Sequence, residues 1–340
     1  MNWKLGSVLA AALLVFGSPG RADDAAPASR GAALLEYRPP AQIPFPDDNP
    51  YSAAKAELGR RLFFDPVFSN SRTMACATCH DPKLSWGDGR AHAQGDDAND
   101  MSLRSPTLLD VAWMPHLGWD GKFRNLESVA FAPITAAANM NLKEDALLAR
   151  LDALPDYVAA FAAAFPDRAI SRRNVELALA TYERTIVSGE APFDRWVQGD
   201  EAAIDEAAKR GFDLFNGRAH CSGCHSGWTF SDGSFHDIGT AGGDDIGRGR
   251  LFPTSVKLRY AFKTPTLRDA ARRAPYMHDG SVPTLRAVID LYDRGGVARP
   301  SRSELIGPLN LTEGEKSDLL AFLQTLSGVQ PPGAPSLQPH

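Results

Sequence analysis

Cysteine is scarce in this chain, and its few positions carry the most information. The 340 residues include four cysteines, and all four lie in two copies of one short pattern. Cys76-Ala77-Thr78-Cys79-His80 and Cys221-Ser222-Gly223-Cys224-His225 each place a histidine directly after a cysteine pair. This CxxCH arrangement is typical of a covalent attachment site for a c-type haem.

Three other uses of these cysteines compete with haem attachment. Two disulfides would suit an exported protein, but they would not require the two histidines. A thioredoxin-like redox motif would need a βαβ context, which is absent from the pattern. A Cys2His2 zinc site would need histidines spaced apart rather than next to the second cysteine. The repeated complete motif therefore favours two covalently attached haems.

An excess of positive charge is also absent. The chain has 36 basic and 41 acidic residues, which gives a net charge of −5. This balance argues against binding to nucleic acid, which needs a basic face. It suits a basic redox partner without requiring one.

Long apolar runs are missing except at the N-terminus. Lys4 precedes an apolar run over residues 5–16, and Gly20-Arg21-Ala22 supplies small residues for cleavage. We expect residues 1–22 to be a secretory signal peptide, with an uncleaved anchor as the alternative. The run is too short to span a membrane, and no later run is longer. The sequence therefore predicts a periplasmic protein without a membrane span in its mature chain.

The rest of the sequence predicts a mainly α fold, because helical spacing is frequent and strand signals are sparse. Ser171 is a good helix N-cap, and Thr312-x-x-Glu315 is a capping box that opens a last helix. The expected helices cover residues 52–64, 142–165 with a break at Pro155, 171–187, 204–215 and a segment after 312.

A helix, a turn and a CxxCH motif occur in that order twice, which indicates two cytochrome c-like haem domains. Long loops rich in Gly and Asp follow each motif. Residues 23–50 are rich in Ala, Pro and Asp, and we expect a flexible lead-in there. We place the N-terminal haem domain at 51–191, the C-terminal haem domain at 192–330 and a tail at 331–340.

His80 and His225 are the expected proximal iron ligands, because the motif sets each imidazole over its iron. The opposite face of each haem then decides its chemistry. An open position allows reactions with peroxide or oxygen, and a second strong ligand favours electron transfer.

Beyond the motifs the chain resembles the bacterial di-haem cytochrome c peroxidases and the MauG-type enzymes, from about residue 50 to 330. The resemblance rests on short segments that occur in the same order. They are LGRRLFFDP at 58–66, SPT at 105–107, WDG at 119–121, PI at 133–134, PFD at 192–194, TPTLR at 264–268 and APYMHDG at 274–280.

The resemblance implies an enzyme whose first haem reduces hydrogen peroxide and whose second haem passes or stores electrons. By position, Trp119 matches a tryptophan between the two haems, where an indole could relay electrons; an ordinary core tryptophan is the alternative. The reductant would be a small cytochrome, a copper protein, or oxidisable Trp or Tyr side chains of a partner protein.

The resemblance also makes Tyr292 informative. Fourteen residues after His278 the cytochrome c peroxidases carry a methionine ligand, whereas the MauG-type enzymes carry a tyrosine, as this chain does. A tyrosine oxygen favours ferric and higher states, which tilts the interpretation towards oxidation of a partner protein's side chains. Tyr292 also ends an apolar helical stripe that begins at Leu285, so it could be a core residue. Met277 is the rival ligand.

The distal side of the first haem departs from the family pattern. Pro133 matches, but Val129 and Asn139 stand where the family has a glutamine and a glutamate. Asn139 can hydrogen-bond peroxide but cannot take its proton. Glu127 and Glu144 are possible substitutes, although Glu127 has the position of a solvated acid at a helix start.

His92 lies in the loop after the first motif, where the cytochrome c peroxidases carry a histidine that caps the first haem. Its spacing does not match that histidine, and a surface loop position is the alternative. His92 could also substitute for the missing distal acid. If it does not bind iron, the first haem is open at rest.

The family also binds calcium between its domains, through an asparagine near Ser105-Pro106 and carbonyl groups near Pro275. Here Arg104 and Arg273 occupy those neighbourhoods. Two guanidinium groups would repel a dication unless they point away, since calcium needs a shell of oxygen ligands. Asn99 could supply one of these, so calcium is a third possible cofactor.

A non-catalytic di-haem electron-transfer cytochrome is the alternative to the enzyme. It predicts two six-coordinate haems that do not respond to peroxide. Val129 and Asn139 keep this alternative open.

Overall fold

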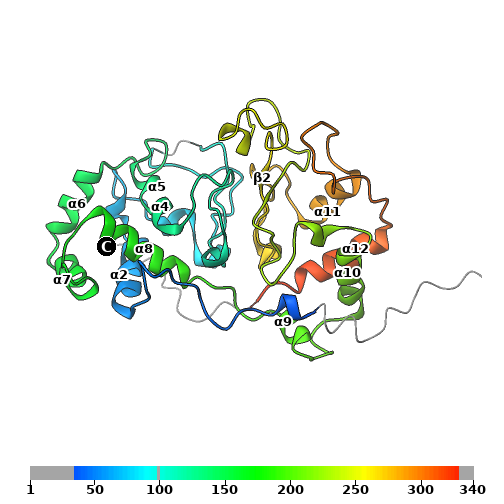
Figure 1. Cartoon of the computed structure of the whole chain (residues 1–340), viewed down its shortest axis with the longest axis horizontal. Helices are drawn as coiled ribbons and strands as arrows, with labels where there is room; N and C mark the ends of the chain where they lie inside the picture. The colour runs from blue at the N-terminus through cyan, green and yellow to red at the C-terminus, as the bar shows by residue number, and fades with distance from the viewer. Residues whose placement is uncertain (1–33, 98–99, 329–340) are drawn as a thin grey trace, which may run out of the picture.

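The computed structural model describes residues 34–97 and 100–328, and within them the fold is mainly α-helical with long loops, as predicted (Figure 1). Figure 1 shows two helical bodies side by side, one built from α2 to α8 and the other from α9 to α12. The expected signal peptide at 1–22 and the tail at 331–340 lie outside the described residues. Within the described part, no helix is long and apolar enough to cross a membrane.

The first body contains seven α-helices and three short 3₁₀ segments among its described residues. The α-helices are α2 (Ala53–Phe64), α3 (Cys76–Cys79), α4 (Leu126–Ala130), α5 (Ala132–Thr135), α6 (Glu144–Asp152), α7 (Pro155–Ala164) and α8 (Arg172–Arg184). The 3₁₀ segments are Pro66–Phe68, Pro82–Leu84 and Val111–Trp113. Ser171 caps α8 as predicted, its side chain accepting the backbone N–H of Asn174.

The second body follows the same plan with fewer helices. Its α-helices are α9 (Pro192–Val197), α10 (Glu206–Asn216), α11 (Leu285–Arg294) and α12 (Glu313–Gln324), with 3₁₀ segments at Cys221–Gly223, Arg248–Arg250 and Ala270–Arg272. Two short antiparallel strands, β1 (Phe235–His236) and β2 (Phe262–Lys263), pair within its loops. The predicted capping box of Thr312 and Glu315 opens α12.

Each CxxCH motif is preceded by a helix that is packed tightly through a glycine. A Cβ atom on Gly59 of α2 would lie 2.0 Å from the backbone oxygen of Ala178 in α8. A Cβ atom on Gly211 of α10 would likewise lie 2.0 Å from the backbone oxygen of Asp318 in α12. The repeated helix-turn-motif unit seen in the sequence therefore has the same close helix contact in both bodies.

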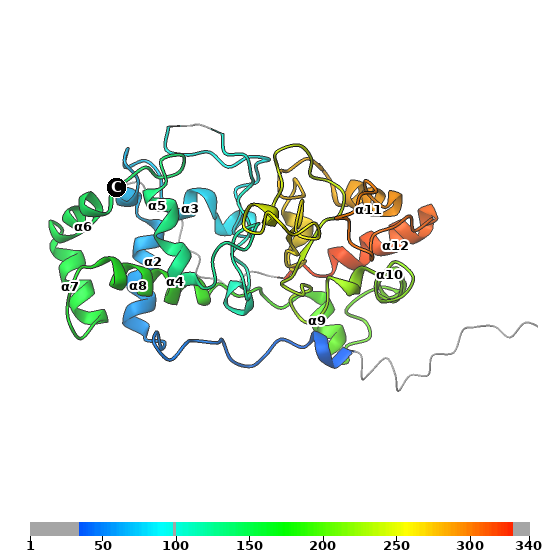
Figure 2. The same cartoon turned by 45° about the horizontal axis from the view of Figure 1, so that its top comes forward.

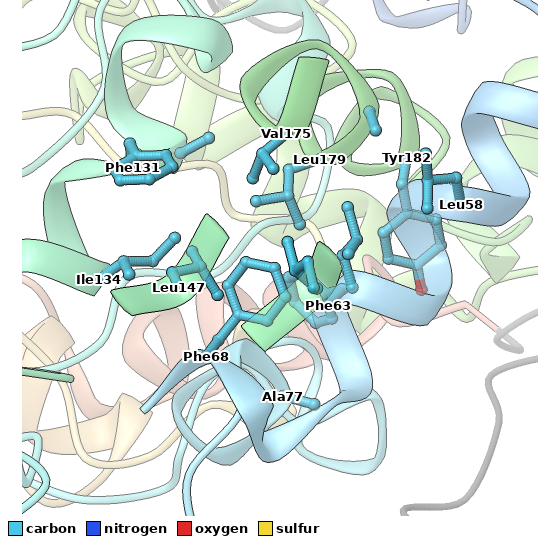
Figure 3. Packing of buried hydrophobic residues seen from close by; sticks show 14 of the residues in the cluster. Leu58, Phe63, Phe68, Ala77, Phe131, Ile134, Leu147, Val175, Leu179 and Tyr182 are labelled. Carbon is cyan, nitrogen blue, oxygen red and sulfur yellow. The ribbon is translucent and has the colours of Figure 1, made fainter. Parts of the chain in front are cut away.

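The two bodies have separate cores. The first is a mixed aliphatic and aromatic cluster around Phe63 and Leu179, shown in Figure 3. The second is mainly aromatic, with Phe193, Phe212 and Phe322 in mutual ring contact. These cores fix the positions of the two motifs that follow α2 and α10.

The expected flexible lead-in at 23–50 is wrong where the structure describes it, from residue 34 onward. Tyr37 is 0% exposed in the second core, stacks on Phe230, and donates its hydroxyl to Asn216. Asn49 is equally buried in the first body, where it donates to Glu127. The segment between them runs along one side of both bodies as a strap (Figure 2).

Candidate haem sites and the wall between them

A cavity lies within the second body, with part of its wall supplied by the first. It is lined by the second motif through Cys221, Cys224 and His225. The His225 Nδ1–H donates to the backbone oxygen of Phe230 over 2.8 Å, which leaves Nε2 free to bind a metal. Burial lowers the pKa of His225, so the imidazole is neutral, as ligation requires. The residues present therefore fit a c-type haem.

The first motif has the same local geometry. Cys76 and Cys79 lie on α3, and the His80 Nδ1–H donates to the backbone oxygen of Trp86 over 3.3 Å. Burial lowers the pKa of His80 as well. All four cysteine thiols are free rather than paired in disulfides, which fits haem attachment at both motifs.

Tyr292 and Met277 both line the cavity of the second body. The structure therefore brings both candidate ligands to the cavity that His225 also lines. The apolar stripe that begins at Leu285 faces this cavity along α11 as well as the core. Burial raises the pKa of the Tyr292 hydroxyl.

Trp119 lies where the first body meets the second and lines the same cavity. We call this contact region the wall; it includes Arg104 and Trp119 of the first body and Lys263 and residues 273–278 of the second. The indole Nε1–H of Trp119 donates to the backbone oxygen of Arg104 over 2.9 Å, and its own backbone oxygen accepts the N–H of Lys263. Its ring centroid is 6.5 Å from that of His278. Both bodies therefore hold this tryptophan.

Lys263 is a cavity residue that the sequence reasoning missed. Its ammonium donates to the backbone oxygen of His116, and no carboxylate in the described part of the chain pairs with it. Burial lowers its pKa to about 8. A haem carries two carboxylates, so a half-buried cation of the cavity wall that has no carboxylate partner would be suited to bind one of them. A lone lysine in a two-residue strand gave no signal of this in the sequence.

Pro133 lies in α5 and Asn139 in the turn that follows it, and neither residue lines the cavity of the second body. The backbone oxygen of Pro133 accepts the N–H of Met140, and that of Asn139 accepts the N–H of Asp96. The loop after the first motif therefore packs against the Asn139 turn. His92 lies in this loop with its side chain exposed.

Glu127 is not the solvated acid that we predicted. It is 5% exposed, and its carboxylate accepts two hydrogen bonds from the Arg184 guanidinium at 2.7 and 3.0 Å and one from Asn49. Burial raises its pKa, but these hydrogen bonds outweigh burial and hold the pKa below its ordinary value. Glu144, the other candidate, forms an ion pair with Arg172 on the surface.

The expected calcium neighbourhood does not fit a calcium ion. The Arg104 guanidinium donates to the backbone oxygens of Pro275 and Arg273, the latter over 2.8 Å. The Arg273 guanidinium does not bind these two oxygens and donates to the backbone oxygens of Thr266 and Arg268. The two carbonyl groups near Pro275 are thus already bound by a cation of the protein. Asn99 lies outside the described residues.

The comparisons with known proteins agree with this arrangement. The family description "Di-haem cytochrome c peroxidase" matches residues 53–202. The chain is 48% identical over 305 residues to the methylamine utilization protein MauG of Methylorubrum extorquens, covering 89% of this chain and 86% of the relative. It is 46% identical to the MauG of Methylophilus methylotrophus, covering 86% and 88% of the two chains.

A solved structure of a MauG-like protein associated with microbial copper homeostasis superimposes with a TM-score of 0.80 at 33% identity, covering 86% of this chain and 94% of that one. Family membership implies two c-type haems, for which this chain has two cysteine pairs. The chain therefore belongs to the di-haem cytochrome c peroxidase and MauG family of haem-dependent oxidoreductases.

Proposed function

We propose that this chain is a periplasmic, MauG-like enzyme that uses hydrogen peroxide to oxidise Trp or Tyr side chains of a partner protein. The observation that carries the proposal is Tyr292 in the wall of the second haem cavity. A tyrosine ligand stabilises oxidised iron, which suits the storage of oxidising equivalents better than the acceptance of electrons from a cytochrome. Similarity to proteins named MauG supports the same choice.

Bound haem would supply the redox-active iron at each motif. His80 and His225 would bind through Nε2, and their Nδ1 hydrogen bonds to backbone oxygens fix the ring orientation. Tyr292 would be the second ligand at the His225 site. Because burial disfavours its phenolate, the hydroxyl would give up its proton to water only when its oxygen binds a strong Lewis acid, which ferric iron would supply.

Trp119 would carry electrons between the two sites. Its indole N–H donates to a backbone oxygen, which accepts a hydrogen bond but is too weak a base to remove the proton. The indole would therefore keep its proton when it loses an electron, and the electron could return without a proton transfer. This makes the relay reversible.

Proton handling at the first site would differ from that in the rest of the family. Asn139 would orient peroxide by hydrogen bonding, and the ion-paired Glu127 is not free to accept a proton. We expect peroxide activation to be slower than in a relative with a distal glutamate.

The test is spectroscopy of the purified diferric protein, with wild type compared with Tyr292→Phe and Met277→Leu. We expect the signal of the second haem to change only in the Tyr292 variant. We also expect a high-spin first haem whose spectrum changes with peroxide, and oxidised Trp or Tyr in a partner protein by mass spectrometry. A changed signal only in the Met277 variant, with rapid oxidation of reduced cytochrome c, would favour a cytochrome c peroxidase instead. Two low-spin haems whose spectra do not change on addition of peroxide would identify a simple electron-transfer protein.

A further inference from the structure

Arg104 lies in a loop of the first body and forms hydrogen bonds both to the second body and to Trp119. It is 9% exposed, and its backbone N–H donates to the backbone oxygen of His278 over 3.0 Å. Its backbone oxygen accepts the indole N–H of Trp119. Its guanidinium donates to the backbone oxygens of Pro275 and Arg273. One residue of the first body thus holds the second body's loop at 273–278 and the indole of the proposed relay.

The chemistry of this contact is that of a cation bound by carbonyl groups. Backbone oxygens are ligands that calcium accepts, and here a planar guanidinium fills two of them at once. A dication placed at the same oxygens would have to displace Arg104 and would also be repelled by the guanidinium of Arg273, which lies close enough to Arg104 for burial and that charge together to lower its pKa. The protein therefore supplies its own cation at this point.

We infer that Arg104 replaces a bridging metal ion in this chain and is the positioning residue for Trp119. The guanidinium holds the loop at 273–278, and the backbone of the same residue holds the indole, so movement of one is transmitted to the other. The inference uses the proposed function only for the role of Trp119 as a relay. Independence from calcium rests on the contacts of Arg104 and the charge of Arg273, and it does not use the proposed function.

Arg150 provides a matched control. Its guanidinium also donates to backbone oxygens, those of Val67, Ser69 and Asn70, but all of these lie within the first body. A substitution there removes the same chemistry without touching the wall.

The experiment uses the holoprotein as wild type, Arg104→Asn and Arg150→Asn, each with EGTA or with added calcium chloride. Calorimetry measures calcium binding, and spectroelectrochemistry measures the potentials of the two haems and the rate of electron exchange between them. We expect wild type and Arg150→Asn to bind no calcium and to ignore EGTA. In Arg104→Asn the two carbonyl groups are released and an amide oxygen is added. We expect this variant to exchange electrons about tenfold more slowly in EGTA and to recover with calcium.

Two results would overturn the inference. Calcium binding by wild type, or a change in its haem coupling with EGTA, would show that Arg104 does not replace a metal ion. Unchanged electron exchange in Arg104→Asn with EGTA would show that it does not position Trp119. If that variant does not fold, Arg104→Lys serves, because its single ammonium cannot span both oxygens. It should exchange electrons more slowly and remain insensitive to calcium, and an unchanged rate would count against the inference. None of these readouts uses peroxide or a partner protein, so failure of the proposed function would be seen separately.

Discussion

Glu183 should give the first body an unusual dependence of stability on pH. It lies near the end of α8, is 8% exposed, and its Oε2 has no hydrogen-bond partner among the described residues. Burial is the main cause that raises its pKa to about 8; the charge of Glu127 adds to this and Arg184 opposes it.

The direction of the pH dependence of stability follows from the proton that the native state binds. Between pH 4.5, the ordinary value, and about 8, native Glu183 keeps a proton that the unfolded chain has lost. Its contribution to stability is therefore complete below pH 4.5 and is lost as the pH rises through 8. The gap between the two pKa values corresponds to roughly 5 kcal/mol at full ionisation.

Denaturant unfolding of wild type and Glu183→Gln between pH 5 and 9 measures this directly. Glutamine keeps the shape of the side chain and cannot ionise. The free energy of unfolding of the variant minus that of wild type should therefore increase as the pH rises, by several kcal/mol in total. Glu127→Gln is the control, because that carboxylate is stabilised by Arg184 and its removal should destabilise at neutral pH. Parallel curves for wild type and Glu183→Gln would refute the reasoning.

Three further substitutions test other parts of the structure. Gly59→Ala should lower the free energy of unfolding by about 1–3 kcal/mol because its Cβ would overlap a backbone oxygen of α8, whereas Gly242→Ala, which meets open space, should leave the melting temperature unchanged. Asp194→Asn leaves the buried guanidinium of Arg268 without a carboxylate and should cost about 3–5 kcal/mol in denaturant unfolding, and a loss below 1 kcal/mol would contradict this. Lys263→Met should lower the reduction potential of the second haem relative to Lys263→Arg, because a cation beside a haem favours its reduced state; equal potentials in a redox titration would place the lysine away from the haem.

The local signals in the sequence predicted the helices well. The start of α2, the cap of α8 at Ser171 and the capping box of α12 all agree, because caps and helical spacing act over a few residues. The misses involve partners that are distant in the chain. The sequence around Tyr37 has the composition of a linker, but its ring fills a gap in the core of the second body. Glu127 has the pattern of a solvated acid until Arg184 is brought beside it.

Backbone groups make many of the contacts in the wall between the haem sites. Side chains there can therefore change while the geometry of the wall is kept. Trp119 is held by the backbone N–H of Lys263 and the backbone oxygen of Arg104, and Arg104 is bound to His278 through backbone groups. At Lys263, Arg104 and His278 these contacts use backbone atoms, so they do not depend on the side chains at those three positions. The guanidinium of Arg104 is different, because it joins the two bodies through side-chain atoms. Within this set of contacts, position 104 is therefore where a substitution should change the coupling between the sites most.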